Sequence, residues 1–357
     1  MKIQTNYNLS KLNTFGISVQ AKFFVKITSE IDLKKLFNTP EFKNSEKLFL
    51  GGGSNVLFTK DFDGLVILNK LKGIKILSEN SENVVLRCMG GEIWHDLVIF
   101  AVERGWWGIE NLALIPGTVG AAPMQNIGAY GRELRDVLKS VEAYNLENGE
   151  ENKKKVFSQE ECELGYRDSI FKNKLKDKYF ITAITLLLSK IENKNITYKI
   201  LQEYLEKNKM MDSKTSLARL QPRDISDAVS QIRKSKLPDP AVIGNAGSFF
   251  KNVFVKPKQF EKLQKIYPQI PYFNEPIDIP AITNKNGIIK IPAGWLIEQC
   301  GWKGKRIGNV GVHEKQALVL VNYGGADGKE ILALANKIIA DVREKFGLEL
   351  VPEVNLV

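Results

Sequence analysis

Two glycine-rich segments constrain what this chain can fold into more than any other feature. The longer one, Pro116 to Gly131, contains four glycines and four other small residues. Glycine tolerates positive φ angles and lets main-chain N–H groups converge on an anion, which bulkier side chains would prevent. The shorter one, Gly51 to Asn55, follows the apolar run Leu48 to Leu50, as a turn leaving a buried strand would. One short glycine cluster is more often a tight turn, whereas two such segments favour binding of a diphosphate.

The spacing of these glycines excludes two common nucleotide-binding folds. Neither segment is followed by Gly-Lys-Ser or Gly-Lys-Thr, so neither is a Walker loop. Neither shows three glycines at dinucleotide spacing that open a helix after a strand. We therefore expect the ligand to bind outside a Rossmann unit.

The composition indicates a cytoplasmic protein without a metal centre. With 357 residues the chain is long enough for two or three domains. It has no apolar run of the ~18–20 residues that span a bilayer, and its first residues lack the apolar part of a signal peptide. Cys88, Cys162 and Cys300 are odd in number and far apart, which argues against a disulfide framework and a zinc site. His95 and His313 are the only histidines, so we expect no multi-histidine metal site and no Ser-His-Asp triad.

The charges of the chain favour small phosphorylated ligands over nucleic acid. There are 51 basic and 41 acidic residues, a formal net charge of +10, and the two signs are interspersed. The longest basic run, Lys153 to Lys155, lies beside Glu150 and Glu151 and has no interleaved aromatic residues, unlike a groove for single-stranded nucleic acid. We expect this run to be a solvated face and the surplus charge to steer ligands toward the glycine segments.

The pattern of apolar residues predicts a mixed α and β chain. Short apolar runs predict strands, and apolar residues at helical spacing predict helices bounded by glycine, proline or a capping carboxylate. A polar, lysine-rich stretch at about 189–223 interrupts the pattern and is interpreted as an inserted lid or linker. The expected strands are 65–68, 84–86, 179–188 and 348–356, and the expected helices are 93–104, one that begins behind Asp224 and ends before Pro238, and one that begins behind Asp327 and ends at Gly347.

Four polar side chains stand among apolar neighbours, and each has two interpretations. Ser248, between a glycine turn and two aromatic residues, is either a proton donor in a dry pocket or a turn serine that bonds its own backbone. Arg167 suits a bidentate grip on a carboxylate or a structural ion pair. Lys236 continues the inward face of its helix or complements the helix C-terminus. Glu353 projects opposite the apolar face of its strand, where an edge carboxylate is usually exposed to water.

A series of short blocks runs through nearly the whole chain in a fixed order. The blocks are Asn13–Gly16, Gly51–Asn55, 112–131, Tyr166–Ser169, 236–252, Ala293–Ile297, Val312–His313, Gln316–Val319 and Pro352–Val354. In this order they resemble the UDP-N-acetylenolpyruvoylglucosamine reductases, flavoenzymes that complete UDP-N-acetylmuramate for peptidoglycan. The long inserted stretch and the serine at position 248 resemble the type I branch. One departure is Val253, where many relatives have proline.

The resemblance implies an α+β fold with two kinds of domain. One is an FAD-binding domain of the p-cresol methylhydroxylase (PCMH) type in two lobes, and the other is a separate α+β substrate-binding domain. The expected bounds are 1–72 for the first FAD-binding lobe, with a C-terminal strand at 347–357 returning to it, 73–190 for the second lobe, 191–223 for the inserted lid or linker, and 224–346 for the substrate-binding domain.

The resemblance also implies a reaction and its catalytic residues. NADPH reduces a noncovalently bound FAD, and the reduced flavin gives a hydride to the methylene carbon of UDP-N-acetyl-3-O-(1-carboxyvinyl)-glucosamine. Ser248 matches the residue that protonates the adjacent carbon, and Arg167 with Glu353 matches the pair that stabilises the enolate. The product is UDP-N-acetylmuramate.

Further positions match binding residues of the family. Tyr198 matches a mobile tyrosine lid over the uridyl diphosphate, near which Arg233 falls, and Lys236 matches a diphosphate contact. The substrate-binding positions are Tyr166, Tyr198, Arg233, Lys236, Asn252 and Gln316. The FAD-binding positions are Gly51, Gly52, Gly53, Ser54, Asn55, Ile115, Pro116, Gly117, Thr118, Gly120, Ala121, Ala122, Asn126, Ile127, Gly128, Tyr130, Gly131 and Ile181.

Two other functions remain open on the sequence. One is an FAD oxidase of the same cofactor-domain superfamily that acts on an alcohol or phenol. Such enzymes often carry a flavin-linking histidine near the phosphate loop, and neither His95 nor His313 lies in a glycine segment. The other is a phosphate- or nucleic-acid-binding module without chemistry, which the basic charge suggests. The reductase interpretation implies a UDP-sugar as the partner, no nucleic acid, no membrane, and a monomer.

Overall fold

The structure, a computed structural model, describes residues 1–146, 154–208, 210, 219–275 and 287–357. These residues form two compact units, each of which combines segments that are distant in the sequence. Unit 1 comprises Met1–Tyr7, Ala21–Gly52 and Asp63–Ser235, and unit 2 comprises Asn8–Gln20, Gly53–Phe62 and Lys236–Val357. The domain bounds expected from the sequence stay a prediction.

Unit 1 contains a five-stranded antiparallel sheet in the order β11-β10-β12-β7-β6. Its middle strand β12 is buried without interruption from Phe180 to Leu186, as expected for a strand covered on both faces. The strands predicted at 84–86 and 179–188 are confirmed as parts of β7 and β12. The bounds are Ile74–Glu79 (β6), Asn83–Met89 (β7), Leu138–Asn145 (β10), Lys154–Ser158 (β11) and Tyr179–Ser189 (β12).

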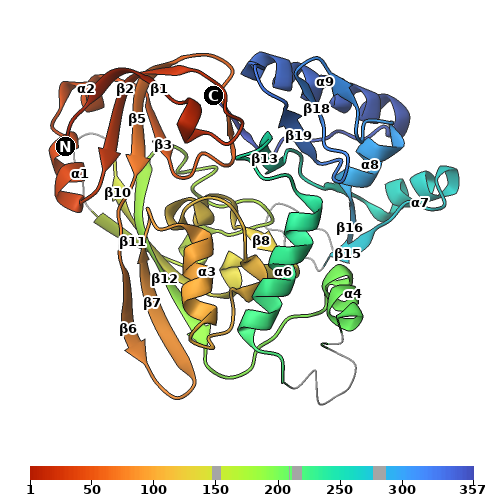
Figure 1. Ribbon diagram of the computed structural model, residues 1–357, viewed down its shortest axis with the longest axis horizontal. Coiled ribbons are helices and arrows are strands. Elements are labelled where there is room, and N and C mark those ends of the chain that lie inside the picture. Colours follow the sequence, from red (N-terminus) through yellow and green to blue (C-terminus); the bar gives the residue numbers. More distant parts are fainter. Residues whose placement is uncertain (147–153, 209, 211–218, 276–286) are drawn as a thin grey trace. The chain divides into compact units, whose positions relative to one another are not determined.

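Helices α3 (Trp94–Val102) and α6 (Pro222–Lys236) pack on this sheet (Figure 1). Leu97 and Val98 of α3 and Val229 of α6 belong to one hydrophobic core together with side chains of β7 and β12. The predicted helix at 93–104 is confirmed, although it ends at Val102.

Helix α6 begins earlier than the sequence analysis expected. Pro222 occupies its first turn, where the absence of an N–H costs no helical hydrogen bond. The carboxylate of Asp224 accepts from the amide of Gln221 at 2.8 Å. Asp224 is therefore inside the first turn, and its prediction as the residue before the helix is wrong.

A four-stranded sheet in the order β1-β2-β5-β3 is also centred on unit 1. Strands β3 and β5 pair in parallel, and helices α1 and α2 share a hydrophobic core with β2 and β5. The strand predicted at 65–68 is confirmed as part of β5. The bounds are Gln4–Asn8 (β1), Gln20–Ile27 (β2), Lys47–Leu50 (β3), Phe62–Asn69 (β5), Glu30–Leu36 (α1) and Pro40–Asn44 (α2).

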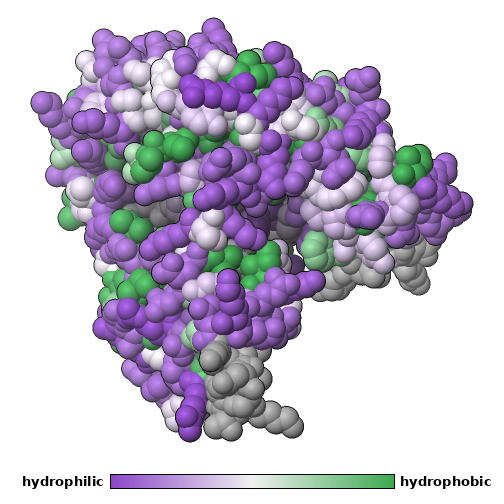
Figure 2. All heavy atoms as spheres, turned by 45° about the vertical axis from the view of Figure 1, so that its right-hand side comes forward, coloured by the Kyte–Doolittle hydropathy of each residue, from purple (hydrophilic) through white to green (hydrophobic). Residues whose placement is uncertain are grey.

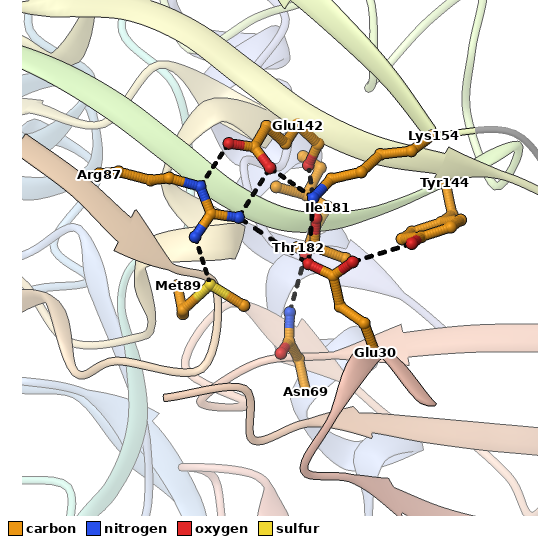
Figure 3. Close-up of polar contacts among 9 residues, drawn as sticks. All are labelled: Glu30, Asn69, Arg87, Met89, Glu142, Tyr144, Lys154, Ile181 and Thr182. Carbon is orange, nitrogen blue, oxygen red and sulfur yellow. Dashed lines mark hydrogen bonds and ion pairs between the residues drawn. The ribbon is translucent and has the colours of Figure 1, made fainter. Parts of the chain in front are cut away.

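A partly buried cluster of charges joins elements of these two layers (Figure 3). Nη2 of Arg87 on β7 donates to the carboxylate of Glu142 on β10 at 2.7 Å. The ammonium of Lys154 lies 2.6 Å from Glu142 and 3.0 Å from Glu30 of α1. The hydroxyl of Tyr144 also donates to Glu30, at 2.8 Å. The cluster therefore ties α1 to the five-stranded sheet.

These contacts correct the expected environment of Lys154. Because its ammonium pairs with two carboxylates, the prediction of a solvated face is wrong for this residue. Lys153, the first residue of the basic run, lies outside the described residues. The hydrogen bond from Arg87 holds the pKa of Glu142 at about 2, so this carboxylate is ionised throughout the physiological range.

Helix α4 (Lys199–Lys207) lies in the stretch interpreted as a lid or linker. Its Leu201 and Leu205 are fully buried in the core of unit 1, on one face of an amphipathic helix. Residues 209 and 211–218 of the same stretch lie outside the described residues. The described part of the stretch therefore includes a packed helix.

Unit 2 contains two small antiparallel sheets and a short parallel pair of strands. The orders are β13-β19-β18-β17 and β14-β16-β15, and β20 pairs with β4. The strand bounds are Val56–Leu57 (β4), Gly244–Ser248 (β13), Val253–Val255 (β14), Phe273–Glu275 (β15), Ile288–Ile291 (β16), Arg306–Ile307 (β17), Val310–Val312 (β18), Val319–Asn322 (β19) and Asn355–Leu356 (β20). The helix bounds are Pro257–Ile266 (α7), Ala293–Gln299 (α8) and Gly328–Phe346 (α9).

Helix α9 begins and ends as the sequence predicts. Asp327 and Glu330 form a reciprocal capping box, with both hydrogen bonds at 2.9 Å. Gly347 follows the helix with φ +63°, a left-handed conformation that favours glycine. The apolar side of α9 contacts β18, β19 and α8.

The segment after α9 is less regular than predicted. Alternate side chains are buried, including Leu350 and Val354, so the expected alternation is present. Ladder pairing is limited to an isolated bridge between Pro352 and Phe250 and to β20. A continuous strand over 348–356 is therefore wrong, because the bridge at Pro352, made by the carbonyl of Val351 and the amide of Glu353, is not continued along the segment.

None of the helices that the structure describes combines the length and apolar character needed to cross a bilayer. On the face shown in Figure 2, hydrophilic side chains predominate and hydrophobic ones form small separate groups. Such scattered apolar residues are normal on protein surfaces.

Candidate active site

In unit 1, Gly51 and Gly52 of the shorter glycine segment lie against the longer segment. A Cβ on Gly52 would lie 2.8 Å from Cα of Gly117, and one on Gly51 would collide with Oγ1 of Thr118. Neither position can therefore carry a side chain. Oγ1 of Thr118 is buried and has no hydrogen-bond partner among the described residues. Exposed main chain beside an unpartnered hydroxyl fits the diphosphate that the sequence predicts.

The rest of the longer segment forms a 3-10 helix, Val119–Gln125, and a short hairpin of Gly128–Ala129 (β8) with Arg132–Glu133 (β9). The amide of Gly120 donates to the carbonyl of Gly90 at 2.8 Å. A Cβ on Gly120 would lie 3.0 Å from Cα of Gly90, so the two backbones approach closely. The predicted positions Ala121 and Ala122 lie in the 3-10 helix.

Asn126 connects this segment to the turn that carries Arg167. Its backbone is left-handed, with φ +42°, and its side chain is buried. Nδ2 donates to the carbonyl of Gly165 at 3.0 Å and to the carboxylate of Glu133 at 2.8 Å. Oδ1 accepts from the amide of Arg135 at 3.0 Å. An asparagine predicted to contact FAD therefore also fixes the loop geometry around it, next to Ile127 and Gly128.

Arg167 occupies a tight turn with a left-handed backbone, φ +52°. Its Nη2 donates to the carbonyl of Gly128 at 2.7 Å, and its guanidinium carbon lies 5.3 Å from the centre of the Tyr166 ring. Ser169, two residues later, donates to the carbonyl of Met124 at 2.8 Å. The turn that contains Arg167 is thus held to the longer glycine segment by these hydrogen bonds and by the bond from Asn126 to Gly165.

Arg233 and Tyr130 belong to the same region of unit 1. Nε of Arg233 is buried and has no hydrogen-bond partner in the described part of the chain. Burial lowers the pKa of Arg233; Tyr130 opposes this shift, and the positive charge of Arg167 adds to it. For Tyr130 the direction is opposite, because burial raises the pKa of its hydroxyl, and the positive charge of Arg233 opposes that shift. Two guanidinium groups therefore lie close enough to repel each other, an arrangement that an anionic ligand would stabilise.

Tyr198 lies beside Tyr130, just before α4. The two rings meet edge to face with centroids 5.4 Å apart, and Tyr198 is 43% exposed. Asn195 anchors its segment, because Nδ2 donates to the carbonyl of Gly131 at 2.8 Å. Nδ2 of Asn111 donates to the carbonyls of both Tyr130 and Asn195, at 2.9 and 2.8 Å. The sequence analysis missed both asparagines, which match no catalytic motif.

Ser248 is the last residue of β13 in unit 2, where a bulge interrupts the pairing with β19. The bulge is fixed by Asn245, a third residue that the sequence analysis missed. Its Oδ1 accepts from the amide of Gly247 at 2.9 Å, and its Nδ2 donates to the carbonyls of Ile243 and Pro238 at 2.8 and 3.2 Å. Gly247 has φ +67°, which only glycine adopts readily. The order Asn-Ala-Gly before Ser248 was the available signal for such a side-chain turn.

Glu353 lies in the C-terminal segment that is hydrogen-bonded to the segment Ser248–Phe249. Its amide donates to the carbonyl of Phe249 at 2.8 Å, and its own carbonyl accepts from Nδ2 of Asn55 at 3.3 Å. Asn55 ends the shorter glycine segment, and the part of this segment from Gly53 to Asn55 belongs to unit 2, as do Ser248 and Glu353. Its neighbour Ser54 is partly buried.

The remaining predicted positions are distributed over both units. Oδ1 of Asn252 accepts from the amide of Ala293 at 3.1 Å, and Lys236 is the last residue of α6. Oε1 of Gln316 accepts from the amide of Leu318 at 3.4 Å. The carbonyl of Ile181 on β12 accepts from Nδ2 of Asn69 at 2.8 Å (Figure 3).

The predicted site residues thus gather in two groups. Unit 1 brings together Arg167, Arg233, Tyr130, Tyr198 and the longer glycine segment. Unit 2 brings together Ser248, Glu353 and Asn55, with Gly53, where φ is +64° and a side chain would collide with the carbonyl of Leu12. Of the three predicted catalytic residues, Arg167 belongs to unit 1 and the other two belong to unit 2.

Comparisons with known proteins match both parts of the chain. Residues 21–153 match an FAD binding domain family, and residues 239–357 match the C-terminal domain of UDP-N-acetylenolpyruvoylglucosamine reductase. A UDP-N-acetylenolpyruvoylglucosamine reductase from Amoebophilus asiaticus is 48% identical over 357 residues, covering all of both chains. One from Flavobacterium johnsoniae is 44% identical over 358 residues, again covering all of both chains.

The chain belongs to the UDP-N-acetylenolpyruvoylglucosamine reductase family. A crystal structure of such a reductase from Thermus caldophilus covers 99% of this chain and 98% of its own, with a TM-score of 0.61 at 22% identity, so the two share a fold. The predicted FAD-binding domain with a separate second domain is confirmed. The predicted enzyme class, UDP-N-acetylmuramate dehydrogenase, is confirmed through membership of the UDP-N-acetylenolpyruvoylglucosamine reductase family. The roles of single residues stay predictions.

Proposed function

We propose that this chain reduces UDP-N-acetyl-3-O-(1-carboxyvinyl)-glucosamine to UDP-N-acetylmuramate with NADPH, as a cytoplasmic monomer of the type I branch. Its membership of the reductase family supports this activity. The geometric observation that carries the proposal is the buried Nε of Arg233, near Arg167 and Tyr130. A buried guanidinium without a hydrogen-bond partner at Nε is costly in the free protein, and a carboxylate or phosphate of the substrate would satisfy it.

Noncovalent FAD is the proposed cofactor. The two glycine segments would hold its diphosphate, because Gly52 and Gly117 expose main chain and Thr118 offers a buried hydroxyl that has no partner within the described ranges of the chain. When bound, FAD supplies the hydride that it has taken from NADPH. The fit of the glycine segments supports this assignment independently of the sequence match to an FAD binding domain.

Three side chains would handle the charge and the proton of the reaction. Reduction of the enolpyruvyl methylene leaves negative charge on the neighbouring carbon, which bears a carboxylate. Arg167, paired with Glu353, would stabilise the resulting enolate. Ser248 would then protonate that carbon. A serine hydroxyl is a weak acid, so the reaction requires the fixed backbone that Asn245 and Gly247 provide around it.

Other residues would bind the rest of the substrate. Tyr198 would close over the uridyl diphosphate, and its exposed position beside Tyr130 supports a side chain that is free to move. Lys236 and Arg233 would contact the diphosphate. Tyr166, Asn252 and Gln316 are the remaining proposed contacts.

The test uses the full-length purified protein with its natural complement of flavin. The proposal predicts a yellow protein whose absorbance bleaches with NADPH under anaerobic conditions and returns when the enolpyruvyl substrate is added. Mass spectrometry should then detect UDP-N-acetylmuramate. Rapid reoxidation by oxygen with no response to the substrate would favour the oxidase alternative. A colourless preparation that binds no FAD would contradict both enzymatic proposals and favour a binding module.

A further inference from the structure

The first turn of α3 is bonded to residues 112–117, which lead into the longer glycine segment. The amide of Trp94 donates to the carbonyl of Gly117 at 3.1 Å, and its indole Nε1 donates to the carbonyl of Leu112 at 3.0 Å. Nδ1 of His95 accepts from the amide of Leu114 at 3.0 Å. Two consecutive helix residues therefore hold this stretch at three points.

The bond from Leu114 to His95 lies at the most unusual point of the stretch. Leu114 has φ +57°, a left-handed conformation that residues other than glycine, asparagine and aspartate rarely adopt. A nearby acceptor for its amide favours this conformation over the extended alternatives. Nδ1 can accept only when it carries no proton, so the imidazole must be neutral with its hydrogen on Nε2.

We propose that His95 is a positioning residue for the FAD diphosphate loop and acts only in its neutral form. The inference rests on the proposed binding of FAD by the glycine segments. Neutral His95 fixes Leu114, and with it the course of the chain through Ile115 and Pro116 to Gly117. Protonated His95 would present an N–H to the N–H of Leu114, so the loop would lose its fixed course.

The surroundings of His95 favour the neutral form. Burial lowers the pKa of His95, and the charges that face it are Asp96 on α3 and Asp227, Arg233 and Lys234 on α6. The two carboxylates raise the pKa and the two cations lower it, and the outcome is a pKa below the ordinary value. Because the folded form prefers neutral imidazole, its contribution is fully present above the unfolded pKa and is lost as pH falls toward the folded pKa.

The experiment measures FAD affinity, apart from turnover. Full-length protein that carries FAD is diluted at a series of pH values between about pH 8 and about pH 5.5, and the fluorescence of released FAD gives the dissociation constant. Three variants are compared with the wild type: His95→Ala, which removes the acceptor; His95→Asn, whose Oδ1 restores it without a titrating group; and His313→Asn, which removes the other histidine of the chain.

We expect FAD affinity of the wild type and of His313→Asn to fall as pH decreases. His95→Ala should bind FAD roughly threefold to tenfold more weakly at pH 8, the scale of one hydrogen bond. His95→Asn should bind like the wild type at pH 8 and should lose the pH dependence. Equal affinity of His95→Ala and wild type, or an unchanged pH dependence in His95→Asn, would overturn the inference while leaving the proposed function intact. Protein that binds no FAD at any pH would contradict the proposed function itself.

A second measurement covers the case in which the alanine variant fails to fold. Nitrogen-15 NMR of the wild type distinguishes the two neutral histidine tautomers, and His313→Asn assigns the signals because the chain has only these two histidines. The inference predicts a hydrogen on Nε2 of His95 at neutral pH. A hydrogen on Nδ1 would contradict it.

Discussion

The main-chain amide of Glu353 donates a 2.8 Å hydrogen bond to the carbonyl of Phe249, the residue that follows Ser248. This bond joins the C-terminal segment of the chain to the segment Ser248–Phe249 through backbone atoms alone. Substitution of the side chain of Ser248 or of Glu353 therefore leaves this hydrogen bond in place. The proposed roles of Ser248 and Glu353 can be tested by mutation without removing the bond that holds them together.

The first prediction concerns Tyr198 as a substrate lid. Tyr198→Ala should raise the KM for the enolpyruvyl substrate roughly tenfold, the scale of one hydrogen bond to a charged group, because the uridyl diphosphate loses a contact. Reduction of the flavin by NADPH should be unchanged, since it does not need the uridyl group. Steady-state and single-turnover kinetics measure the two quantities. An unchanged KM would reject the lid assignment.

The second prediction concerns Arg233. Arg233→Met should weaken substrate binding by about 1.5–3 kcal/mol, the scale of a hydrogen bond to a charged group. Thermal stability should stay equal or increase, because the substitution removes a partly buried charge whose buried Nε has no partner among the described residues. Calorimetric titration and thermal unfolding measure these effects.

Arg223→Met is the matched control for Arg233. Arg223 lies on the same helix, is 51% exposed, and pairs with Glu103 at the surface. Its substitution should leave substrate affinity unchanged, since exposed ion pairs contribute little. Arg233 would be a structural residue if its variant unfolded more easily and bound substrate normally.

The third prediction concerns the charge cluster of Glu142. Arg87 holds the pKa of Glu142 at about 2, so the cluster contributes stability above the unfolded pKa of about 4.5 and loses it as pH falls toward 2. Glu142→Gln should lower the free energy of unfolding at neutral pH by about 2–3 kcal/mol and flatten its dependence on pH in the acid range. Denaturant titrations at several pH values measure both. Glu161→Gln, at an exposed pair with Lys155, should have little effect, and equal losses in the two variants would contradict the account.

Local sequence patterns predicted those elements whose signals lie within one or two turns of chain. The capping box of Asp327 with Glu330 predicted the start of α9, and the mostly apolar run at 179–188 predicted the strand β12. The glycines at positions 51, 52 and 117 were predicted to expose main chain, and they do so where the two segments meet.

Patterns failed where partners are distant in the sequence. Lys154 looked like part of a solvated run because its partner Glu30 lies on another element, far back in the chain. Asn126, Asn195 and His95 hold loops through backbone atoms, and such bonds leave no motif in the sequence. The sequence therefore predicted single helices and strands better than the contacts between residues that are distant in the chain.

The most direct test of the proposed reaction separates its two half-reactions in Ser248→Ala. Anaerobic stopped-flow spectroscopy follows bleaching of the flavin by NADPH and then its recovery with the enolpyruvyl substrate. Reduction by NADPH needs no proton from Ser248, so its rate should match that of the wild type. Completion of turnover with substrate should be roughly 10²–10⁴-fold slower, the range for loss of a general acid, and Ser248→Cys should recover part of it. Unimpaired recovery with normal formation of UDP-N-acetylmuramate would contradict the assignment of Ser248 as the proton donor.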